Sequence, residues 1–223
     1  MCGKNQLDKK IRLERLGYYF SCVVKIVREM TINFSGVVVV KKRGLKYKVP
    51  SWTDLLVIKE VVLDGDYEKY GVCPTDQDRV IVDIGAAFGD WTIMTAKKYP
   101  QAVVYAFEPN KKYFAALVEN CRLNQAGNVK LINKAVVSLE ELKEEAGSKI
   151  DHLKCDCEGC EFEIFKSKCW NKKLKIKRLV MEYHVTEEHK LAALKQNLEI
   201  NGYKVKTYSQ RGVAGIGILI AGI

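Results

Sequence analysis

The stretch Val80-Ile81-Val82-Asp83-Ile84-Gly85-Ala86-Ala87-Phe88-Gly89-Asp90 decides the fold of this 223-residue chain. It begins with a mostly apolar run of the length of one buried strand, and Asp90 to Lys98 has the spacing of a helix. Glycines between a strand and a helix let the backbone turn tightly and approach a ligand. The stretch therefore predicts a strand, a tight turn and a helix, with a ligand site at the turn.

The same alternation of strand and helix continues along the chain. Further strands are predicted at Ala102–Phe107, Val129–Ile132, Ile150–Cys157 and Leu179–Tyr183, and helices at Lys111–Arg122, Ser138–Glu145, Phe162–Cys169 and Leu191–Leu198. The last two strand-like runs, Tyr203–Tyr208 and Val213–Ile220, are joined by a turn too short for a crossover helix, so they pair as an antiparallel hairpin. We therefore expect an α/β three-layer sandwich with a mostly parallel, seven-stranded sheet and an antiparallel C-terminal hairpin.

The positive charge of the chain is concentrated near its start. The formal net charge is +10, and residues 1–50 hold 12 Lys and Arg against 3 Asp and Glu, while the rest hold 25 against 24. A uniformly basic nucleic-acid-binding surface is therefore a poor description of the chain, whereas a basic extension on a near-neutral domain is a good one. We predict an extension over residues 1–72 that packs on a domain over residues 73–223.

The extension has helical and strand-like parts. Leu7–Met30 has mostly helical apolar spacing, so we expect an N-terminal helix; with its basic residues it could lie on an anionic membrane surface, although such stripes usually pack on their own domain. Ile32–Val40 and Leu45–Val49 predict a β-hairpin with a basic turn. After Pro50 a helix is expected, capped by Ser51 and Asp54, with a core face formed by Trp52, Leu55, Leu56, Ile58 and Val62.

Composition excludes several classes of protein. The chain is 48% hydrophobic and 29% charged, which is an ordinary globular balance and not that of a disordered or fibrous protein. Apolar runs are too short to span a bilayer, and no secretory signal pattern appears at the start. We therefore expect a cytoplasmic protein whose eight cysteines are reduced thiols.

An acidic residue at the end of the second predicted strand indicates the ligand. Glu108 follows the glycine loop by about 20 residues, the spacing at which a carboxylate accepts hydrogen bonds from ribose hydroxyls. A nucleoside cofactor is therefore predicted. Nicotinamide-binding domains usually carry three glycines as G-x-G-x-x-G, so the looser loop and the terminal hairpin favour S-adenosylmethionine.

Four stretches, Val82–Thr92, Tyr105–Asn110, Leu153–Glu161 and Met181–His184, resemble in the same order the FkbM family of S-adenosylmethionine-dependent methyltransferases. The resemblance spans roughly residues 52 to 200, and Lys-x-Asp-x-Glu-Gly-x-Glu is its most specific part. It implies a class I, Rossmann-like methyltransferase fold. It also implies O-methylation of a hydroxyl on a glycan, a glycolipid or a small metabolite.

The resemblance also implies which residues hold the cofactor. The implied contacts are Asp83, Gly85, Ala87 and Gly89 around the methionine part, Glu108 at the ribose, Asn133 and Ala135 near the adenine, and Asp156 beside the methyl group. Two features depart from the family. Ala87 stands where the family commonly has Asn, and the segment after Val137 is short, which bears on the substrate more than on the fold.

Candidate catalytic residues follow the fourth and fifth strands. A sugar hydroxyl benefits from a general base, and Asp156, Glu158 and His184 lie near the carboxyl ends of strands, where open α/β sheets bind ligands. For Glu158 a helix-start acid, and for His184 a structural hydrogen bond, are alternative roles. Lys154 is expected to pair with a carboxylate.

Several cysteines lie close together in the sequence. Cys157 and Cys160 have the C-x-x-C spacing of zinc ligands, with Cys155 and Cys169 nearby. Cys155 and Cys157 alternate along a predicted buried strand, however, where cysteine behaves as a small hydrophobe. We therefore predict no metal site.

Three functions stay open at this point. The favoured one is methyl transfer from S-adenosylmethionine to a hydroxyl of a carbohydrate-like acceptor. RNA methylation is supported only by the basic N-terminal region, so a nucleic-acid partner is not expected. A non-catalytic binding module with the same fold is the third hypothesis, motivated by Ala87 and the short segment.

Overall fold

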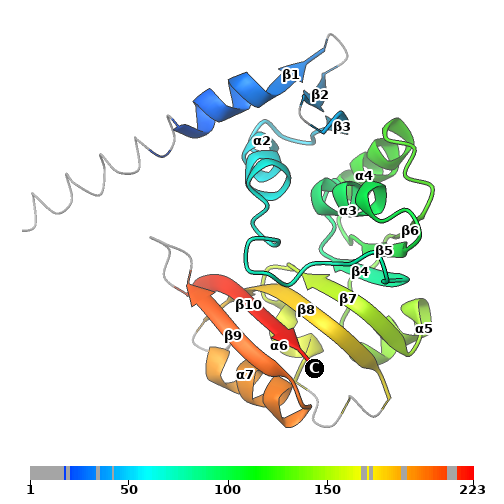
Figure 1. Ribbon diagram of the computed structural model, residues 1–223, viewed down its shortest axis with the longest axis vertical. Coiled ribbons are helices and arrows are strands. Elements are labelled where there is room, and N and C mark those ends of the chain that lie inside the picture. The colour runs from blue at the N-terminus through cyan, green and yellow to red at the C-terminus, as the bar shows by residue number, and fades with distance from the viewer. Residues whose placement is uncertain are drawn as a thin grey trace, which may run out of the picture.

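The computed structural model describes residues 18, 21–33, 36–41, 43–166, 170, 173–186, 190–209 and 215–223. Its main feature is a seven-stranded sheet with the strand order β6-β5-β4-β7-β8-β10-β9 (Figure 1). The strands are β4 (Val80–Ile84), β5 (Val103–Phe107), β6 (Val129–Ile132), β7 (Lys149–Cys155), β8 (Lys175–His184), β9 (Lys204–Ser209) and β10 (Ile216–Gly222).

The pairing of the strands confirms the predicted topology. Strand β4 lies between β5 and β7 and is parallel to both, and β7 is parallel to β8. Strand β10 is inserted between β8 and β9 and runs antiparallel to both. The predicted C-terminal hairpin is therefore present, and it supplies the antiparallel strand of the sheet.

Helices cover both faces of the sheet, which makes the predicted three layers. They are α3 (Asp90–Lys98), α4 (Lys111–Leu123), α5 (Leu139–Ala146), α6 (Cys160–Ile164) and α7 (Leu191–Ile200). Alternate residues of β4 enter different cores: Ile81 packs with residues of α3 and α4, whereas Val82 packs with residues of α5, α6 and α7 (Figure 1). Period-two alternation of a strand buried on both faces explains why β4 is apolar almost throughout.

The N-terminal strands differ from the prediction. Instead of one strand over Ile32–Val40, the structure has β1 (Met30–Ile32) and β2 (Val37–Val40), which pair with each other antiparallel. The Asn33 side chain accepts a hydrogen bond from the Val37 N–H, and Gly36 has φ 74°, so a turn interrupts the β-branched run. With β3 (Leu45–Lys48) beside β2, the predicted two-stranded hairpin is a three-stranded sheet.

Residues 18 and 21–29 are helical, as predicted, while residues 7–17, 19 and 20 of the predicted helix lie outside the described part, and its last residue, Met30, begins β1. Cys22 is fully buried, but Val23, Val24 and Val27 are exposed. An ion pair between Lys25 and Asp64 ties the helix to the later part of the N-terminal extension. Across the described residues, no helix has both the length and the apolar character needed to cross a bilayer.

The segment after Pro50 forms one helical stretch from two elements, α2 (Asp54–Val57) and η1 (Ile58–Asp64). Asp54 accepts a hydrogen bond from the Ser51 N–H, which is one half of the predicted cap. The other half is wrong, because the residue before the helix is Thr53 and its side chain makes no capping hydrogen bond. Ile58 and Val62 are fully buried, but Trp52 is 69% exposed, so its predicted place in the core is wrong. Trp52 precedes the first helical turn, where helical periodicity does not yet set the direction of a side chain.

Two asparagines of α4 join the N-terminal sheet to the main domain. The side chain of Asn120 accepts from the Lys48 N–H at 2.7 Å and donates to the carbonyl oxygens of Lys48 at 3.0 Å and Phe88 at 2.8 Å. Asn124 makes the same pair of bonds with the backbone of Lys46. The two side-chain amides therefore make the hydrogen bonds that the backbone of a neighbouring strand would make along this edge of β3.

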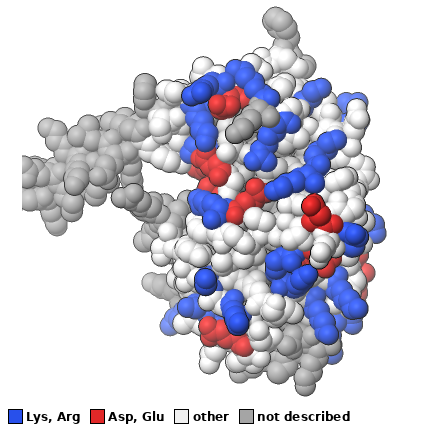
Figure 2. Space-filling model, in the orientation of Figure 1, with Lys and Arg blue, Asp and Glu red and all other residues white. Residues whose placement is uncertain are grey.

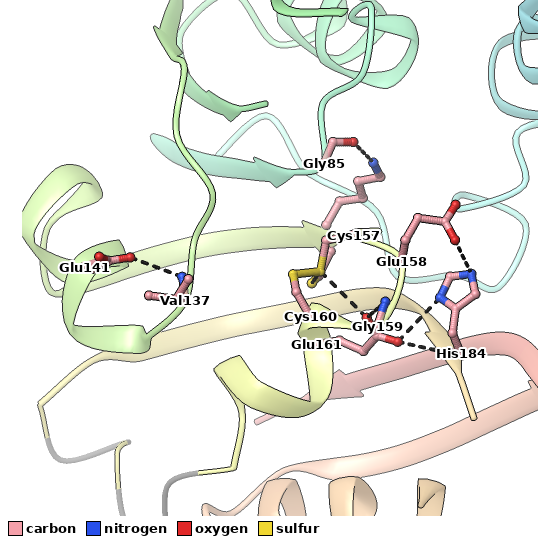
Figure 3. The surroundings of a disulfide bond; sticks show 11 residues. Gly85, Val137, Glu141, Cys157, Glu158, Gly159, Cys160, Glu161 and His184 are labelled. Atoms are coloured by element: carbon pink, nitrogen blue, oxygen red, sulfur yellow. Dashed lines mark hydrogen bonds and ion pairs between the residues drawn. A yellow bond between two sulfur atoms is a disulfide. The ribbon is translucent and has the colours of Figure 1, made fainter. Parts of the chain in front are cut away.

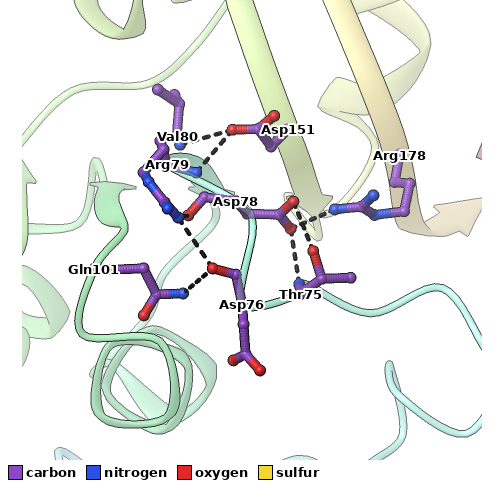
Figure 4. A network of polar contacts seen from close by, with 8 residues as sticks. All are labelled: Thr75, Asp76, Asp78, Arg79, Val80, Gln101, Asp151 and Arg178. Carbon is purple, nitrogen blue, oxygen red and sulfur yellow. Dashed lines mark hydrogen bonds and ion pairs between the residues drawn. The ribbon is translucent and has the colours of Figure 1, made fainter.

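A polar network at the opposite end of the sheet fixes the start of β4 (Figure 4). The Asp151 carboxylate of β7 accepts from the Arg79 and Val80 N–H groups at 2.8 and 3.1 Å. Asp78, which is buried, pairs with Arg178 of β8. Backbone and side-chain bonds thus tie the ends of three adjacent strands away from the ligand-binding edge.

The asparagine pairing predicts a stability effect. We expect Asn120→Ala to lower the free energy of unfolding by about 2 to 4 kcal/mol, because each buried polar group left unpaired costs about 1 to 3 kcal/mol. Denaturant unfolding measures this effect, with the exposed Arg122→Ala on the same helix as a control expected to change stability by less than about 0.5 kcal/mol. A loss below about 1 kcal/mol for Asn120→Ala would contradict the role given to this side chain.

Candidate functional site

A cavity of about 680 Å³ lies at the carboxyl ends of β4, β5 and β7. This is the edge at which open α/β sheets bind ligands, and the volume is that of a small-molecule site. Its wall is formed by the loop after β4, the residues after β5, β6 and β7, part of β10, and the segment from Asp54 to Tyr70 of the N-terminal region. The cavity therefore lies where the sequence predicted the ligand.

The two glycines of the loop after β4 are needed for close packing. Gly85 has φ 77°, and a Cβ at this position would lie 1.7 Å from the carbonyl oxygen of Asp156. Gly89 has φ 91°, and a Cβ there would lie 2.6 Å from the Leu117 side chain. Gly85 lines the cavity, whereas Gly89 packs helix α3 against α4. The predicted role of these residues in holding the cofactor is thus indirect for Gly89.

Ala87 and Glu108 are connected across the cavity rim. The Ala87 N–H donates to Glu108 Oε2 at 2.9 Å, and the Asn110 N–H donates to Glu108 Oε1 at 2.7 Å. Burial raises the pKa of Glu108, and these two donors lower it in part. Ala87 has φ 46°, a left-handed backbone conformation that Asn tolerates better than Ala. Glu108 is held in place at the cavity wall, and each oxygen keeps acceptor capacity for a hydroxyl.

Asp83 lies behind the cavity and acts through Lys154. It is fully buried, its carboxylate is 3.0 Å from Lys154 Nζ, and it accepts from the Thr92 hydroxyl at 2.5 Å. The ion pair with Asp83 confirms the predicted pairing of Lys154 with a carboxylate. Lys154 also donates to the carbonyl oxygen of Gly85 at 2.9 Å. Burial acts to lower the pKa of Lys154, but the neighbouring carboxylates outweigh it and raise the pKa above its ordinary value. The pair fixes the loop that carries the glycine.

Asp90, the first residue of α3, lines the cavity and was not among the predicted site residues. Its carboxylate accepts a hydrogen bond from the Trp91 N–H. Burial raises the pKa of Asp90 to about 7, an effect that Lys154 only partly offsets. The clue in the sequence was its place directly after the second glycine, at the start of a helix.

The loop after β6 forms the predicted adenine side of the cavity. Lys134, Ala135 and Val136 line it. Asn133 lies beside them, and its side-chain amide donates to the carbonyl oxygens of Glu108 at 2.7 Å and Pro109 at 3.3 Å. Asn133 is therefore placed to hold the backbone after β5.

Asp156 follows β7 directly and lines the cavity. Its Oδ2 accepts a hydrogen bond of 2.5 Å from the Tyr67 hydroxyl. Tyr67 is buried in the N-terminal segment, and burial followed by the charge of Asp156 raises its pKa well above the ordinary value, so it remains a donor. The sequence analysis missed Tyr67, because only its packing against the sheet brings it to Asp156.

The three predicted catalytic residues come together at the ends of β7 and β8. Single side-chain atoms of Asp156, Glu158 and His184 all lie within 4.8 Å of one another. His184 Nε2 is 3.4 Å from Glu158 Oε2, and His184 Nδ1 is 3.5 Å from Glu161 Oε1 (Figure 3). Carboxylates with an imidazole are a donor set that a divalent cation accepts, although the Glu158 side chain is 85% exposed. The same groups serve equally as acids and bases.

Glu182 of β8 adds a further carboxylate to this part of the cavity, and it was not predicted. It lines the cavity, and its Oε1 is 3.9 Å from His184 Nε2. Burial, followed by the charge of Asp156, raises the pKa of Glu182 to about 7. This part of the cavity is therefore lined by several acidic side chains.

The cysteines differ from the prediction of reduced thiols. Cys157 and Cys160 form a disulfide, while Cys155 is buried as a free thiol (Figure 3). The physical reason is the turn after β7: the strand ends at Cys155, Glu158 and Gly159 have positive φ, and the two Cα atoms come within 5.5 Å. The expectation that Cys155 behaves as a small buried hydrophobe is confirmed.

Residues 125–205 of this chain match the family model of the FkbM methyltransferase domain. Methyltransferase 1 of Beauveria bassiana (strain ARSEF 2860) is 35% identical over 71 residues, which are 32% of this chain and 27% of that protein. The tRNA(Phe) (4-demethylwyosine(37)-C(7)) aminocarboxypropyltransferase of Methanocaldococcus jannaschii is 29% identical over 147 residues, 62% of this chain and 55% of that protein. The chain thus spans only about a quarter of the length of the first relative and about half of the length of the second.

A solved structure confirms the fold over almost the whole chain. Magnesium protoporphyrin IX methyltransferase from Synechocystis PCC 6803, determined with bound S-adenosylmethionine, matches with a TM-score of 0.54 and 18% identity and covers 91% of this chain and 90% of that one. The fold of a class I methyltransferase is therefore shown. The similarity to the FkbM methyltransferase domain thus covers residues 125–205, and the similarity in fold extends over almost the whole chain.

Proposed function

We propose that the chain binds S-adenosylmethionine in this cavity and transfers its methyl group to a hydroxyl of a neutral, carbohydrate-like acceptor. The observation that carries the proposal is the placement of Glu108 and Asp156 on the walls of one cavity. Glu108 is held by two backbone N–H groups, and Asp156 is held by Tyr67. One carboxylate is thus available for a ribose and the other for the reacting end.

The charge of the cavity suits a cationic cofactor. Among its lining residues are eight acidic side chains, Asp54, Glu60, Asp66, Asp90, Glu108, Asp156, Glu158 and Glu182, and three lysines, Lys69, Lys134 and Lys154. Each of the three lysines is paired with a carboxylate, namely Asp66, Glu141 and Asp83. The acids that remain would attract the positively charged sulfonium and ammonium groups of the cofactor.

For methyl transfer the protein mainly has to position the acceptor hydroxyl in line with the methyl group and to supply one base. The cofactor, when bound, supplies a sulfonium methyl group that is already electrophilic. Holding the nucleophile in line is worth up to about 7 to 11 kcal/mol in well-oriented systems. In this proposal Asp156 accepts the proton of the acceptor hydroxyl, and the hydrogen bond from the Tyr67 hydroxyl orients its carboxylate. The products are then a methyl ether and S-adenosylhomocysteine.

The same acidic lining favours a neutral acceptor over a phosphate-bearing one. An anionic group that entered beside Asp156, Glu158 and Glu182 would meet like charges in a partly buried setting. A sugar hydroxyl instead finds carboxylate acceptors and the aromatic side chain of Tyr70 along the same wall. This supports the carbohydrate-like acceptor that the family resemblance implies.

RNA methylation is the second candidate, and two observations favour it. The Methanocaldococcus relative is named for an action on tRNA(Phe). Lys and Arg side chains also spread over the face of the molecule that Figure 2 shows. On this hypothesis the outer surface holds phosphates while the acidic cavity receives a single nucleoside. Binding to RNA would then weaken steeply with rising salt.

The ribose role of Glu108 predicts weaker cofactor binding in its variants. We expect Glu108→Gln to raise the Kd for S-adenosylmethionine about 10- to 100-fold, because hydrogen bonds to a charged group are worth about 1.5 to 3 kcal/mol. Isothermal titration calorimetry measures the Kd, with Glu119→Gln on α4 as the control that should bind normally. An unchanged Kd for Glu108→Gln would remove the ribose role, and a wild-type chain that binds no cofactor would favour the non-catalytic hypothesis.

The raised pKa of Asp90 predicts that cofactor affinity depends on pH. Below pH 7 the Asp90 carboxyl is mostly protonated and neutral, so a cationic ligand loses an attraction that is present above pH 7. We expect affinity for S-adenosylmethionine to rise from pH 6 to pH 8, by at most about tenfold per pH unit below the pKa. Calorimetry over this range should show a weaker pH dependence in Asp90→Asn, whereas the exposed Asp76→Asn should follow the wild type.

A methyl-transfer screen tests the acceptor class. Methyl-labelled cofactor is incubated with neutral oligosaccharides, glycolipid vesicles and tRNA, and we expect label on hydroxyl groups of the first two. Asp156→Asn should lower kcat about 10²- to 10⁴-fold, the usual contribution of a general base, while the Kd for the cofactor changes only a few-fold. Label on tRNA alone would overturn the carbohydrate proposal in favour of RNA methylation.

A further inference from the structure

We propose that Cys157 and Cys160 form a reversible thiol–disulfide exchange site in the wall of the cavity, which a dithiol reductant opens. The oxidised pair holds this wall in the shape that binds the cofactor, so reduction weakens binding. The existence of the exchange site is independent of the proposed function, while its effect on affinity rests on S-adenosylmethionine being the ligand.

The location of the disulfide supports this proposal. Cys157 directly follows Asp156, and Cys160 is the first residue of α6. Both cysteines line the cavity and are partly exposed, so a small dithiol reaches them through the same opening as a ligand. A change at this bond therefore acts next to the carboxylate that lies at the reacting end of the site.

The turn between the two cysteines is closed by the disulfide and by a hydrogen bond of 3.4 Å from the Cys160 N–H to the Cys157 carbonyl oxygen. Glu158 has φ 56° and Gly159 has φ 106°, so both residues of the turn are in the left-handed region, which is unfavourable for Glu. The buried carboxylate of Glu161 also holds the turn, because it accepts a hydrogen bond of 2.9 Å from the Gly159 N–H. This bond does not constrain Glu158. Opening the disulfide lets Glu158 leave its strained conformation and moves the cavity wall at Cys157.

The third cysteine nearby is excluded from the exchange. Cys155 Sγ lies 3.6 Å from Cys157 Sγ, close enough to compete for the disulfide. Cys155 is fully buried, however, and burial followed by the charges of Glu161 and Asp156 raises the pKa of its thiol well above the ordinary value. Because the thiolate is the attacking form, Cys155 stays a thiol and the site has two exchanging cysteines.

The exchange balances with one dithiol as the reductant. A thiolate of the dithiol attacks one sulfur of the pair, the bond between Cys157 and Cys160 breaks, and the released sulfur takes up a proton. The second thiol of the reductant then attacks the mixed disulfide and frees the other cysteine. The pair gains two electrons and two protons, and the dithiol becomes a disulfide.

Differential alkylation with peptide mapping tests the site in the full chain. Free thiols are blocked with one reagent, the protein is unfolded and reduced, and newly exposed thiols are labelled with a second. We expect the second label on Cys157 and Cys160 before dithiothreitol treatment and the first label on both afterwards. Calorimetry of the same samples should show the Kd for S-adenosylmethionine at least fivefold higher after reduction.

Two variants give the controls. The double variant Cys157→Ser and Cys160→Ser should bind the cofactor with the weaker affinity whether or not dithiothreitol is present. Cys73→Ser, which alters a free cysteine away from the cavity, should keep the full response to the reductant. The double variant is checked for folding by its thermal unfolding transition, so that a loss of structure is recognised.

The outcomes separate this proposal from the proposed function. First label on both cysteines in the air-oxidised protein would overturn the exchange site, whatever the cofactor result. A disulfide that opens without any change in Kd would overturn its control over binding. Absence of cofactor binding in both redox states would instead contradict the proposed function, and the alkylation pattern would still decide whether the exchange site exists.

Discussion

The buried ion pair between Asp83 and Lys154 joins the two central strands at the point where both loops of the site begin. Asp83 of β4 lies beside Lys154 of β7 in the parallel register, and Lys154 also binds the carbonyl oxygen of Gly85. Removing one partner of such a pair leaves an uncompensated buried charge, at a cost of about 3 to 5 kcal/mol. The ion pair therefore fixes the positions of the glycine loop and of Asp156 relative to each other. Neither Asp83 nor Lys154 forms part of the ribose or acceptor contacts proposed above.

The N-terminal region forms part of the cavity wall and of its hydrogen bonds. Residues from Asp54 to Tyr70 supply one wall of the cavity, and Tyr67 orients Asp156 through its hydroxyl. Ile58, Val62 and Tyr67 also belong to the hydrophobic cluster that contains Ile81 of β4. Because the same segment contributes to the core and to the cavity, its packing on the sheet and the geometry of the site are physically linked.

Opposite charges are separated between the outside and the inside of the molecule. The chain as a whole carries +10, and basic side chains spread over the visible face (Figure 2), yet most ionisable groups around the cavity are acidic. The basic surface explains why net charge alone suggests an anionic partner. The acidic cavity instead suits a cationic cofactor and a neutral acceptor, because partly buried charges interact more strongly than exposed ones.

The order of strands and helices, the antiparallel hairpin and the strand-end residues Glu108 and Asp156 were determined by the sequence itself. Hydrophobic period and turn length are local properties, and the ends of parallel strands meet at one edge of a sheet. Only the tertiary structure decided that Tyr67 reaches Asp156, that Asn133 turns to backbone carbonyls, and that Cys157 pairs with Cys160. These outcomes depend on packing between distant segments and on left-handed backbone at Glu158 and Gly159, which no local pattern of side chains specifies.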